Sequence, residues 1–311
     1  MFIVDRLLPI GLNLLCGSSK IGKSWLALDL AISVSKGNTF LGFNTNKSSV
    51  LYYALEDTKN RLYERGKILL NGSNFPSNLY GSTCASNLSC GFLNNLENEL
   101  NNNPDIKLVI IDTLQKIRGK INSSETAYAY DYREMSELKR FCDNKNICML
   151  LIHHTRKAQD SDIYNTINGT TGLIGTSDNT FILSKDNRMD NKAILSITGR
   201  DIENEEYVLE FNSKDCKWNM VSNLRDYELK EETIEFNNSL VMSTILSIKR
   251  PFSVTSTELS ELIEKKYNIN LEPYTIGLEI NKYEKILLDK CHIKHINKRT
   301  STKRIHTFID V

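Results

Sequence analysis

The sequence of 311 residues predicts an α/β fold: a mostly parallel sheet flanked by helices, with an antiparallel edge extension, followed by a smaller C-terminal domain. Three observations support this prediction. Short apolar runs alternate with segments of helical periodicity up to about residue 220, as in parallel sheets covered on both faces. From about residue 179, short strand-like segments are joined by polar turns. After residue 230 the pattern changes to helices and a terminal hairpin.

The first apolar run, residues 12–16, is expected to form a buried strand. The spacing Gly17, Gly22, Lys23, Ser24 follows it and leads into a helical segment. Strand, GxxxxGK[ST] and helix in this order are the context of a P-loop, whose N–H groups and helix N-terminus bind phosphate. We therefore predict an ATP site in which Lys23 reaches the phosphates and Ser24 ligates Mg²⁺. The expected nucleotide-binding residues are Gly17, Ser18, Ser19, Lys20, Ile21, Gly22, Lys23, Ser24 and Trp25.

The remaining elements of the first domain follow in order along the chain. Apolar runs favour strands, and a period of 3.6 residues favours helices. Parallel strands are expected at residues 49–55, 79–84, 107–111 and 147–152, and helices at 58–70, 92–100 and 125–142. Short antiparallel strands are expected at residues 180–183, 192–198, 206–211 and 217–221.

Two carboxylates stand where strands of this sheet end. Asp112 ends the run KLVIID, at the carboxyl edge where ligands bind in open α/β sheets, and is expected to hold Mg²⁺ with Ser24. A simple cap of the following turn is the alternative for Asp112. Glu56 follows the run SVLYYAL and is a candidate for polarising an attacking water. Asp57 or Thr58 is expected to cap the next helix, and Asp57 is the preferred residue.

Polar residues also follow two later strands. His153 and His154 come after the run ICMLLI, and we expect one beside the γ-phosphate and the other in the core. Zinc binding is the alternative, but adjacent strand residues point to opposite faces and no further ligands are near in sequence. Arg200 lies in a turn after the strand at 192–198. It is either solvated or an arginine finger that reaches a neighbouring subunit.

The order of these motifs resembles the RecA-like P-loop ATPases, particularly the plasmid and mobile-element replicative helicases of the RepA group (AAA_25-like). The pieces that carry the resemblance are GLNLLCGSSKIGKSWLALDLA, LYYALEDT, VIIDTL, LLIHHTRKA, GTTGLIGTSDN and TGRD, within residues 1 to about 220. The resemblance implies phosphate binding by Lys23 and a Walker B role for Asp112. It further implies that Glu56 is the catalytic base, His154 the γ-phosphate sensor and Arg200 the finger acting in trans.

The same resemblance implies a homo-oligomeric ring, usually a hexamer, with two loops lining a central channel. Here these loops are residues 116–124 and 156–171, after the Walker B and sensor strands. Their basic starts and polar content are typical of loops that follow a nucleic acid backbone, so single-stranded DNA is the expected partner. The candidate contacts are Lys116, Arg118, Lys120, Arg156 and Lys157.

The domain boundaries are expected at 1–222 for the ATPase domain, 223–230 for a polar linker and 231–311 for the second domain. Helices near 232–248, 256–267 and 273–289, followed by a hairpin at 292–310, resemble a winged helix. Residues 282–311 contain eight Lys or Arg against three acids. Duplex DNA is therefore one expected partner of this domain, and a protein is the other. The candidate DNA contacts are Lys298, Arg299, Lys303 and Arg304.

Composition excludes several other classes of protein. The net charge of +1 provides no global basic field. The seven cysteines are scattered without a CxxC motif, which argues against a disulfide framework and favours a cytoplasmic location. Residues 1–10 are too short and polar for a signal peptide, and no apolar run of about 18 residues predicts a membrane span.

Two functions fit these features. The first is a ring-forming, DNA-stimulated ATPase that acts as the replicative helicase of a plasmid, phage or integrated mobile element. The alternative is an ATP-switched DNA-binding initiator, helicase loader or recombination mediator without unwinding activity. Glu56 favours turnover, because a pure switch does not need a hydrolytic base.

Overall fold

A computed structural model of the chain describes residues 1–120, 125–156, 160, 162–187, 189–299 and 303–311. Of the residues singled out in the sequence, Lys157 lies outside these ranges. The chain divides into two compact units, Met1–Leu224 and Arg225–Val311, and each unit is described by itself.

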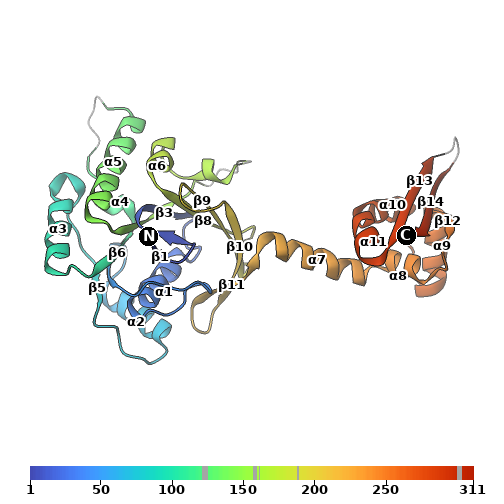
Figure 1. Cartoon of the computed structure of the whole chain (residues 1–311), viewed down its shortest axis with the longest axis horizontal. Helices are drawn as coiled ribbons and strands as arrows, with labels where there is room; N and C mark the ends of the chain where they lie inside the picture. The colour runs from blue at the N-terminus through green and yellow to red at the C-terminus, as the bar shows by residue number, and fades with distance from the viewer. Residues whose placement is uncertain (121–124, 157–159, 161, 188, 300–302) are drawn as a thin grey trace. The chain divides into compact units, whose positions relative to one another are not determined.

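A long mixed sheet forms the centre of the first unit (Figure 1). Its strands lie in the order β11-β10-β9-β8-β3-β7-β6-β4-β5, parallel from β8 to β5 and antiparallel from β8 to β11. This arrangement confirms the predicted α/β class with a mostly parallel sheet. The strands are β3 (Gly11–Gly17), β4 (Ser49–Ala54), β5 (Leu79–Ser82), β6 (Ile106–Asp112), β7 (Cys148–His154), β8 (Asn179–Ser184), β9 (Lys192–Gly199), β10 (Glu205–Asn212) and β11 (Lys217–Asn223).

The strand register aligns the ends that carry the candidate site residues. Gly17 at the end of β3 pairs with His154 at the end of β7. Asp112 at the end of β6 pairs with Ala54 of β4 on one side and with Ile152 of β7 on the other. Because these strands are parallel, their carboxyl ends meet at one edge of the sheet.

Helices cover both faces of this sheet, and the alternation of side chains along each strand supplies both interfaces. Leu15 and Ile110 face α1, whereas Leu14 and Ile111 belong to the hydrophobic cluster of the other helices. The helix α2 packs outside α1 through Leu69, Leu70, Leu28 and Ile32. The bounds are α1 (Lys23–Lys36), α2 (Lys59–Leu70), α3 (Phe92–Asn102), α4 (Leu114–Ile117), α5 (Ala127–Lys145) and α6 (Thr171–Thr176), with short 3-10 turns η1 (Leu88–Cys90) and η2 (Ile163–Thr166).

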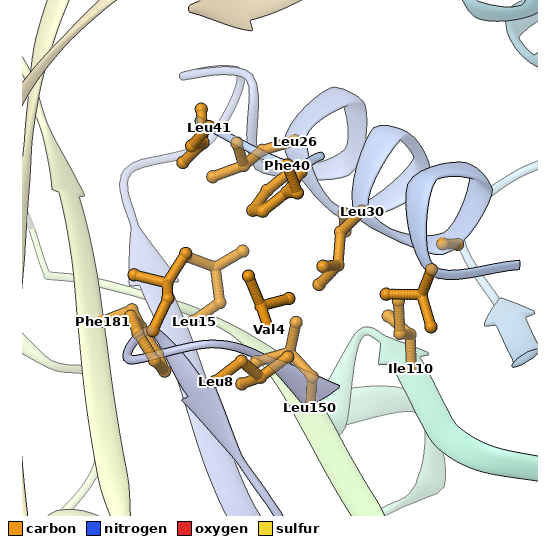
Figure 2. Packing of buried hydrophobic residues seen from close by; sticks show 14 of the residues in the cluster. Val4, Leu8, Leu15, Leu26, Leu30, Phe40, Leu41, Ile110, Leu150 and Phe181 are labelled. Atoms are coloured by element: carbon orange, nitrogen blue, oxygen red, sulfur yellow. The ribbon is translucent and has the colours of Figure 1, made fainter. Parts of the chain in front are cut away.

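The first ten residues form a small hairpin that the sequence analysis did not predict. β1 (Phe2–Val4) pairs antiparallel with β2 (Leu8–Pro9). Val4 and Leu8 lie in the hydrophobic cluster between α1 and the sheet, with Leu15 and Phe181 (Figure 2). Strands this short show no periodicity in the sequence, so only their burial against α1 identifies them.

The second unit is a helical cluster with a small antiparallel sheet in the order β12-β14-β13. Its core consists of apolar side chains such as Leu259, Ile276, Leu287 and Phe308. The elements are α7 (Leu224–Asn238), α8 (Leu240–Ser247), β12 (Phe252–Thr255), α9 (Ser256–Tyr267), α10 (Pro273–Lys282), α11 (Glu284–Cys291), β13 (Ile293–Arg299) and β14 (Arg304–Asp310).

Three details of this unit differ from the expectation. The expected linker at 223–230 is helical from Leu224 onward, because its Leu, Arg, Glu and Lys residues are good helix formers. The expected first helix is divided at Ser239, whose hydroxyl accepts a hydrogen bond from the Met242 N–H at 2.9 Å and caps α8. The expected third helix is divided at Tyr283, a buried residue whose ring meets Phe236 edge-on.

All seven cysteines lie in the described ranges and are free thiols. No helix in the described part of the chain combines the length and the apolar character that crossing a membrane requires.

A chain of polar side chains lies inside the second unit. His295 Nε2 is 2.9 Å from His306 Nδ1, and His306 Nε2 is 3.1 Å from the Ser256 hydroxyl. At the other end, His295 Nδ1 is 3.1 Å from a Glu284 oxygen. Burial lowers the pKa of His306 to about 4, with His295 and Arg304 acting in the same direction. Burial also lowers the pKa of His295, although Glu284 opposes this shift.

The second unit is therefore expected to lose stability as the pH falls from about 6.5 toward about 4. Over this range the unfolded histidines bind protons that the folded ones do not. Hydrogen-exchange protection of β13 and β14 in the full-length protein, corrected for intrinsic exchange rates, measures the effect. His306→Gln should weaken the pH dependence, and protection that is constant across this range in the unaltered protein would contradict the expectation.

Candidate nucleotide site

The carboxyl edge of the sheet opens into a pocket of about 480 Å³ beside the N-terminus of α1. Residues from four separate stretches of sequence meet here. The lining residues are Ser19, Lys20, Gly22, Lys23, Ser24, Trp25, Ala54, Glu56, Asp57, Arg61, Arg65, Asp112, Thr113 and His154. The structure thus brings together the P-loop, both candidate carboxylates and one histidine of the pair.

Lys23 occupies the centre of the P-loop. Its Nζ donates hydrogen bonds to the carbonyl oxygens of Gly17 at 2.7 Å and Ser18 at 2.9 Å. Burial lowers the pKa of Lys23 to about 8, although Asp112 and Glu56 act in the opposite direction. A phosphate oxygen in the pocket would stabilise the protonated, positively charged form of this amine, which burial disfavours.

The turn before α1 depends on glycine. Gly22 has a φ of 111°, which L residues rarely adopt. A Cβ at this position would also lie 2.9 Å from Nε1 of Trp218, which donates a hydrogen bond to the Gly22 carbonyl at 3.3 Å. The contact with Trp218 of β11 could not be expected from the P-loop motif, because the two residues are 196 positions apart.

Ser24 and Asp112, the two expected Mg²⁺ ligands, both line this pocket. Burial raises the pKa of Asp112, whereas the hydrogen bonds from Ser24 and Tyr52 act to lower it. The Tyr52 hydroxyl donates a hydrogen bond to Asp112 Oδ2 at 3.1 Å. Mg²⁺ commonly takes one or two protein oxygens together with phosphate and water oxygens, so this pair suits the ion. In the described ranges, no group of three His, Cys, Asp or Glu side chains is placed to hold a metal by itself.

Glu56 lies at the mouth of the same pocket. The Thr113 hydroxyl, directly after Asp112, donates a hydrogen bond to Glu56 Oε1 at 3.2 Å. Glu56 itself is exposed, so a water molecule can reach its carboxylate. The geometry holds this base candidate beside the candidate metal ligands without burying its charge.

Of the two expected caps of α2, the preferred Asp57 is wrong and Thr58 is confirmed. The Thr58 hydroxyl accepts a hydrogen bond from the Arg61 N–H at 3.2 Å. Asp57 instead forms ion pairs with Arg61 and Arg65, the latter at 2.6 Å. Arg65 also lies over the Trp25 ring, 5.2 Å from its centroid. The sequence analysis missed both arginines as pocket residues, although their spacing of four residues places them on one face of α2, which starts two residues after Asp57.

The two histidines at the end of β7 face opposite sides of the sheet, as expected. His154 lines the pocket, with Nδ1 3.5 Å from Lys23 Nζ. Burial and the charge of Lys23 lower the pKa of His154, so its ring is neutral at pH 7. His153 is buried, and its Nε2 is 2.5 Å from the carbonyl oxygen of Asn168.

Arg200 lies outside the P-loop pocket of its own chain. Its side chain is 60% exposed and donates a hydrogen bond to the Gly175 carbonyl at 3.2 Å, with Asp178 4.0 Å away. It lines a separate pocket with Lys139 and Arg140 of α5. An action of Arg200 on nucleotide therefore requires the site of another copy of the chain.

The candidate DNA contacts of the first unit differ in exposure. Lys116, Lys120 and Arg156 are exposed, and Arg156 donates a hydrogen bond to the Asn165 carbonyl at 2.9 Å. Arg118, in contrast, is turned inward: its side chain is 10% exposed and pairs with two carboxylates of α5. The sequence could not show this, because the charge pattern of a loop does not reveal which of its cations has a buried partner.

The sequence profile of the AAA_25 family, described as an AAA domain, matches residues 3–160. The chain belongs to the AAA_25 family. The RecA-like P-loop family predicted from the sequence is thereby confirmed, and the matched segment contains the P-loop, Glu56, Asp112 and His154.

Solved structures agree with the AAA_25 assignment at the level of fold. The chain is similar to a DnaB-like replicative helicase whose structure was described with its interactions with primase. The TM-score is 0.56 at 16% sequence identity, and the match covers 70% of this chain and 59% of that chain. The AAA_25 chain thus spans little more than half of the structure it matches. No curated protein matches the chain.

Proposed function

We propose that this protein is an ATP-hydrolysing motor, stimulated by single-stranded DNA, that assembles into a homo-oligomeric ring and acts as a replicative DNA helicase. The observation that carries this proposal is the convergence of Lys23, Glu56, Asp112 and His154 on one pocket at the carboxyl edge of the sheet. A nucleotide switch would need the P-loop alone, whereas a hydrolase also needs a base close to the metal ligands.

In the proposed mechanism, Lys23 and the N–H groups of the P-loop bind and orient the phosphates. Ser24 and Asp112 would hold Mg²⁺, which supplies charge stabilisation at the transferring phosphoryl group. Glu56, oriented by Thr113, would accept the proton of the attacking water. The neutral His154 ring beside Lys23 would contact the γ-phosphate and report its presence to the residues after β7.

The first experiment is ATP hydrolysis with and without single-stranded DNA, with Glu56→Gln as the blank, followed by strand separation of a forked duplex. Stimulated hydrolysis together with strand separation supports the helicase. Hydrolysis that is indifferent to DNA, or stimulated without strand separation, supports the alternative of an ATP-switched initiator, loader or recombination mediator.

The second unit is proposed to be a winged-helix domain that binds duplex DNA. The proposal is supported by the order of α8, β12, α9, α10 with α11, β13 and β14, which resembles that of a winged helix in which β13 and β14 would flank the wing. Lys298, Arg299, Lys303 and Arg304 lie at the ends of these two strands and are exposed. In contrast to these cations, the exposed side chains of α10 include the large apolar residues Tyr274 and Leu278. We therefore place the proposed DNA contact at the wing.

A double variant tests the wing. Lys298→Ala with Arg299→Ala should weaken duplex binding at every sequence and lower the salt slope of the affinity by about one to two. The matched control is Lys265→Ala with Lys266→Ala, which removes two exposed cations from α9. Measurements of duplex affinity over a salt series distinguish the two. Equal behaviour of both double variants would reassign the domain to a protein partner.

The genetic setting of the helicase is proposed from the resemblance of its motifs to plasmid and mobile-element members. A replication assay on a plasmid or phage origin tests this setting separately from the enzymatic activity.

A further inference from the structure

A buried ion cluster holds the segment that follows β6. Arg118 donates from Nη2 to Asp131 at 2.5 Å and from Nε to Glu134 at 2.8 Å. Both acids are on α5, about one turn apart, and both are buried. The guanidinium also lies 4.3 Å from the centroid of the Tyr130 ring. Arg118 is thus fully engaged inside the domain, unlike its exposed neighbours Lys116 and Lys120.

Asp131 uses its second oxygen for the segment that follows β7. The Thr170 N–H and the Thr170 hydroxyl both donate to Asp131 Oδ2 at 2.8 Å. Thr170 caps α6, because its hydroxyl accepts a hydrogen bond from the Gly172 N–H at 3.2 Å. Burial acts to raise the pKa of Asp131, but the hydrogen bonds from Arg118 and Thr170 lower it below its usual range. One ionised carboxylate therefore bridges the two segments.

Glu134 provides a contrast on the same helix. Its described hydrogen bonds come from Arg118 and from the Gly119 N–H at 2.9 Å. Both partners lie directly after α4, in the segment that follows β6. Glu134 is thus buried like Asp131 and pairs with the same arginine, but it makes no described hydrogen bond to Thr170.

The bridge is continuous with the end of β7. The Asn168 N–H donates to the His154 carbonyl at 3.0 Å. On its other side, His153 Nε2 donates to the Asn168 carbonyl, because a carbonyl oxygen only accepts. Thr170 follows two residues later and is held by Asp131. The end of β7 is therefore connected to Asp131 by the hydrogen bonds of Asn168 and Thr170. A displacement of His154 by nucleotide would be transmitted along these contacts to Asp131.

We propose that Asp131 and Arg118 are positioning residues that couple residues 118–119 and 168–170, in the two segments proposed to contact DNA, to each other and to the nucleotide site. The bridge Arg118–Asp131–Thr170 holds these residues in one relative arrangement, which His154 sets from the end of β7. This proposal rests on the proposed DNA-stimulated ATPase and adds the residues that transmit the stimulation.

The test compares Asp131→Asn with Glu134→Gln in the full-length protein. Asparagine has one oxygen and presents an amide to the other donor, so it cannot accept from Arg118 and Thr170 together. Asp131→Asn should raise the single-stranded DNA concentration for half-maximal stimulation about tenfold, the effect of one lost charge-assisted hydrogen bond. It should also speed amide exchange about tenfold in residues 162–170. Glu134→Gln should change neither quantity more than about twofold and should speed exchange near Gly119 instead.

A second pair of variants covers the case in which Asp131→Asn does not fold. Thr170→Ala removes the hydroxyl donor and should shift both readouts in the same direction, whereas Thr170→Ser keeps it and should match the unaltered protein. Equal effects of Asp131→Asn and Glu134→Gln, or unchanged exchange in Thr170→Ala, would overturn the coupling role. If the unaltered protein showed no stimulation by DNA, the proposed function would fail, and amide exchange would still decide whether the bridge couples the segments.

Discussion

Replacing Glu56 with glutamine should lower ATP turnover by about 10²- to 10⁴-fold, the usual contribution of a positioned general base. Glutamine keeps the size of the side chain and can still accept the hydrogen bond from Thr113, but it cannot take a proton from water. Because Glu56 makes no part of the P-loop, the affinity for ATP should change little. Steady-state hydrolysis and equilibrium binding of a fluorescent ATP analogue measure the two quantities.

The matched control for this prediction is Glu64→Gln. Glu64 lies on α2 with its side chain 65% exposed and pairs with Lys67 at the surface, so its replacement should leave turnover unchanged. Turnover of Glu56→Gln within about twofold of the unaltered protein would remove Glu56 from the chemistry. A weakened ATP affinity with normal turnover would instead assign it to binding.

Arg200→Ala should lower turnover about 10³-fold or more, the range known for arginine fingers, while nucleotide binding is retained. The reason is geometric. Arg200 lies outside the pocket that contains Lys23, and it is exposed and oriented by Gly175 and Asp178. Its charge can stabilise a transition state only at the site of a neighbouring copy.

Mixing two inactive variants tests the action in trans. Arg200→Ala subunits keep a complete P-loop, and Lys23→Ala subunits keep the arginine, so a mixed ring contains some complete sites. Recovered hydrolysis on mixing supports the finger. Arg140→Ala is the control. Arg140 lines the same pocket as Arg200, and its replacement by alanine removes the same charge. Unchanged turnover in Arg200→Ala would return this residue to the interpretation of a solvated turn.

The two predictions also bear on assembly. Glu56 should act in the same subunit as Lys23, since both line one pocket, and its loss should not be repaired by Lys23→Ala subunits. A mixture that recovers activity with Arg200→Ala but not with Glu56→Gln would therefore separate the residues of one site into those supplied by each copy.

Much of the nucleotide site was predictable from contiguous sequence. The P-loop spacing dictates a backbone conformation within a few residues, and Gly22 satisfies it locally with its positive φ. Asp112 and His154 were expected at strand ends, because apolar runs predict buried strands and parallel strands align their carboxyl ends. Local geometry and the period of the strands were sufficient to group these residues.

Only the tertiary structure decided which charged residues are free of buried ion pairs and which of them line the nucleotide pocket. Arg118 reads as a DNA contact in the sequence, yet Asp131 and Glu134 bury it. Arg61 and Arg65 line the pocket and form ion pairs with Asp57. Trp218 contacts Gly22, although the two residues are 196 positions apart in the sequence. The physical reason is that a P-loop or a strand is specified by neighbours along the chain, whereas the partner of a charge or an aromatic ring is set by packing between distant segments.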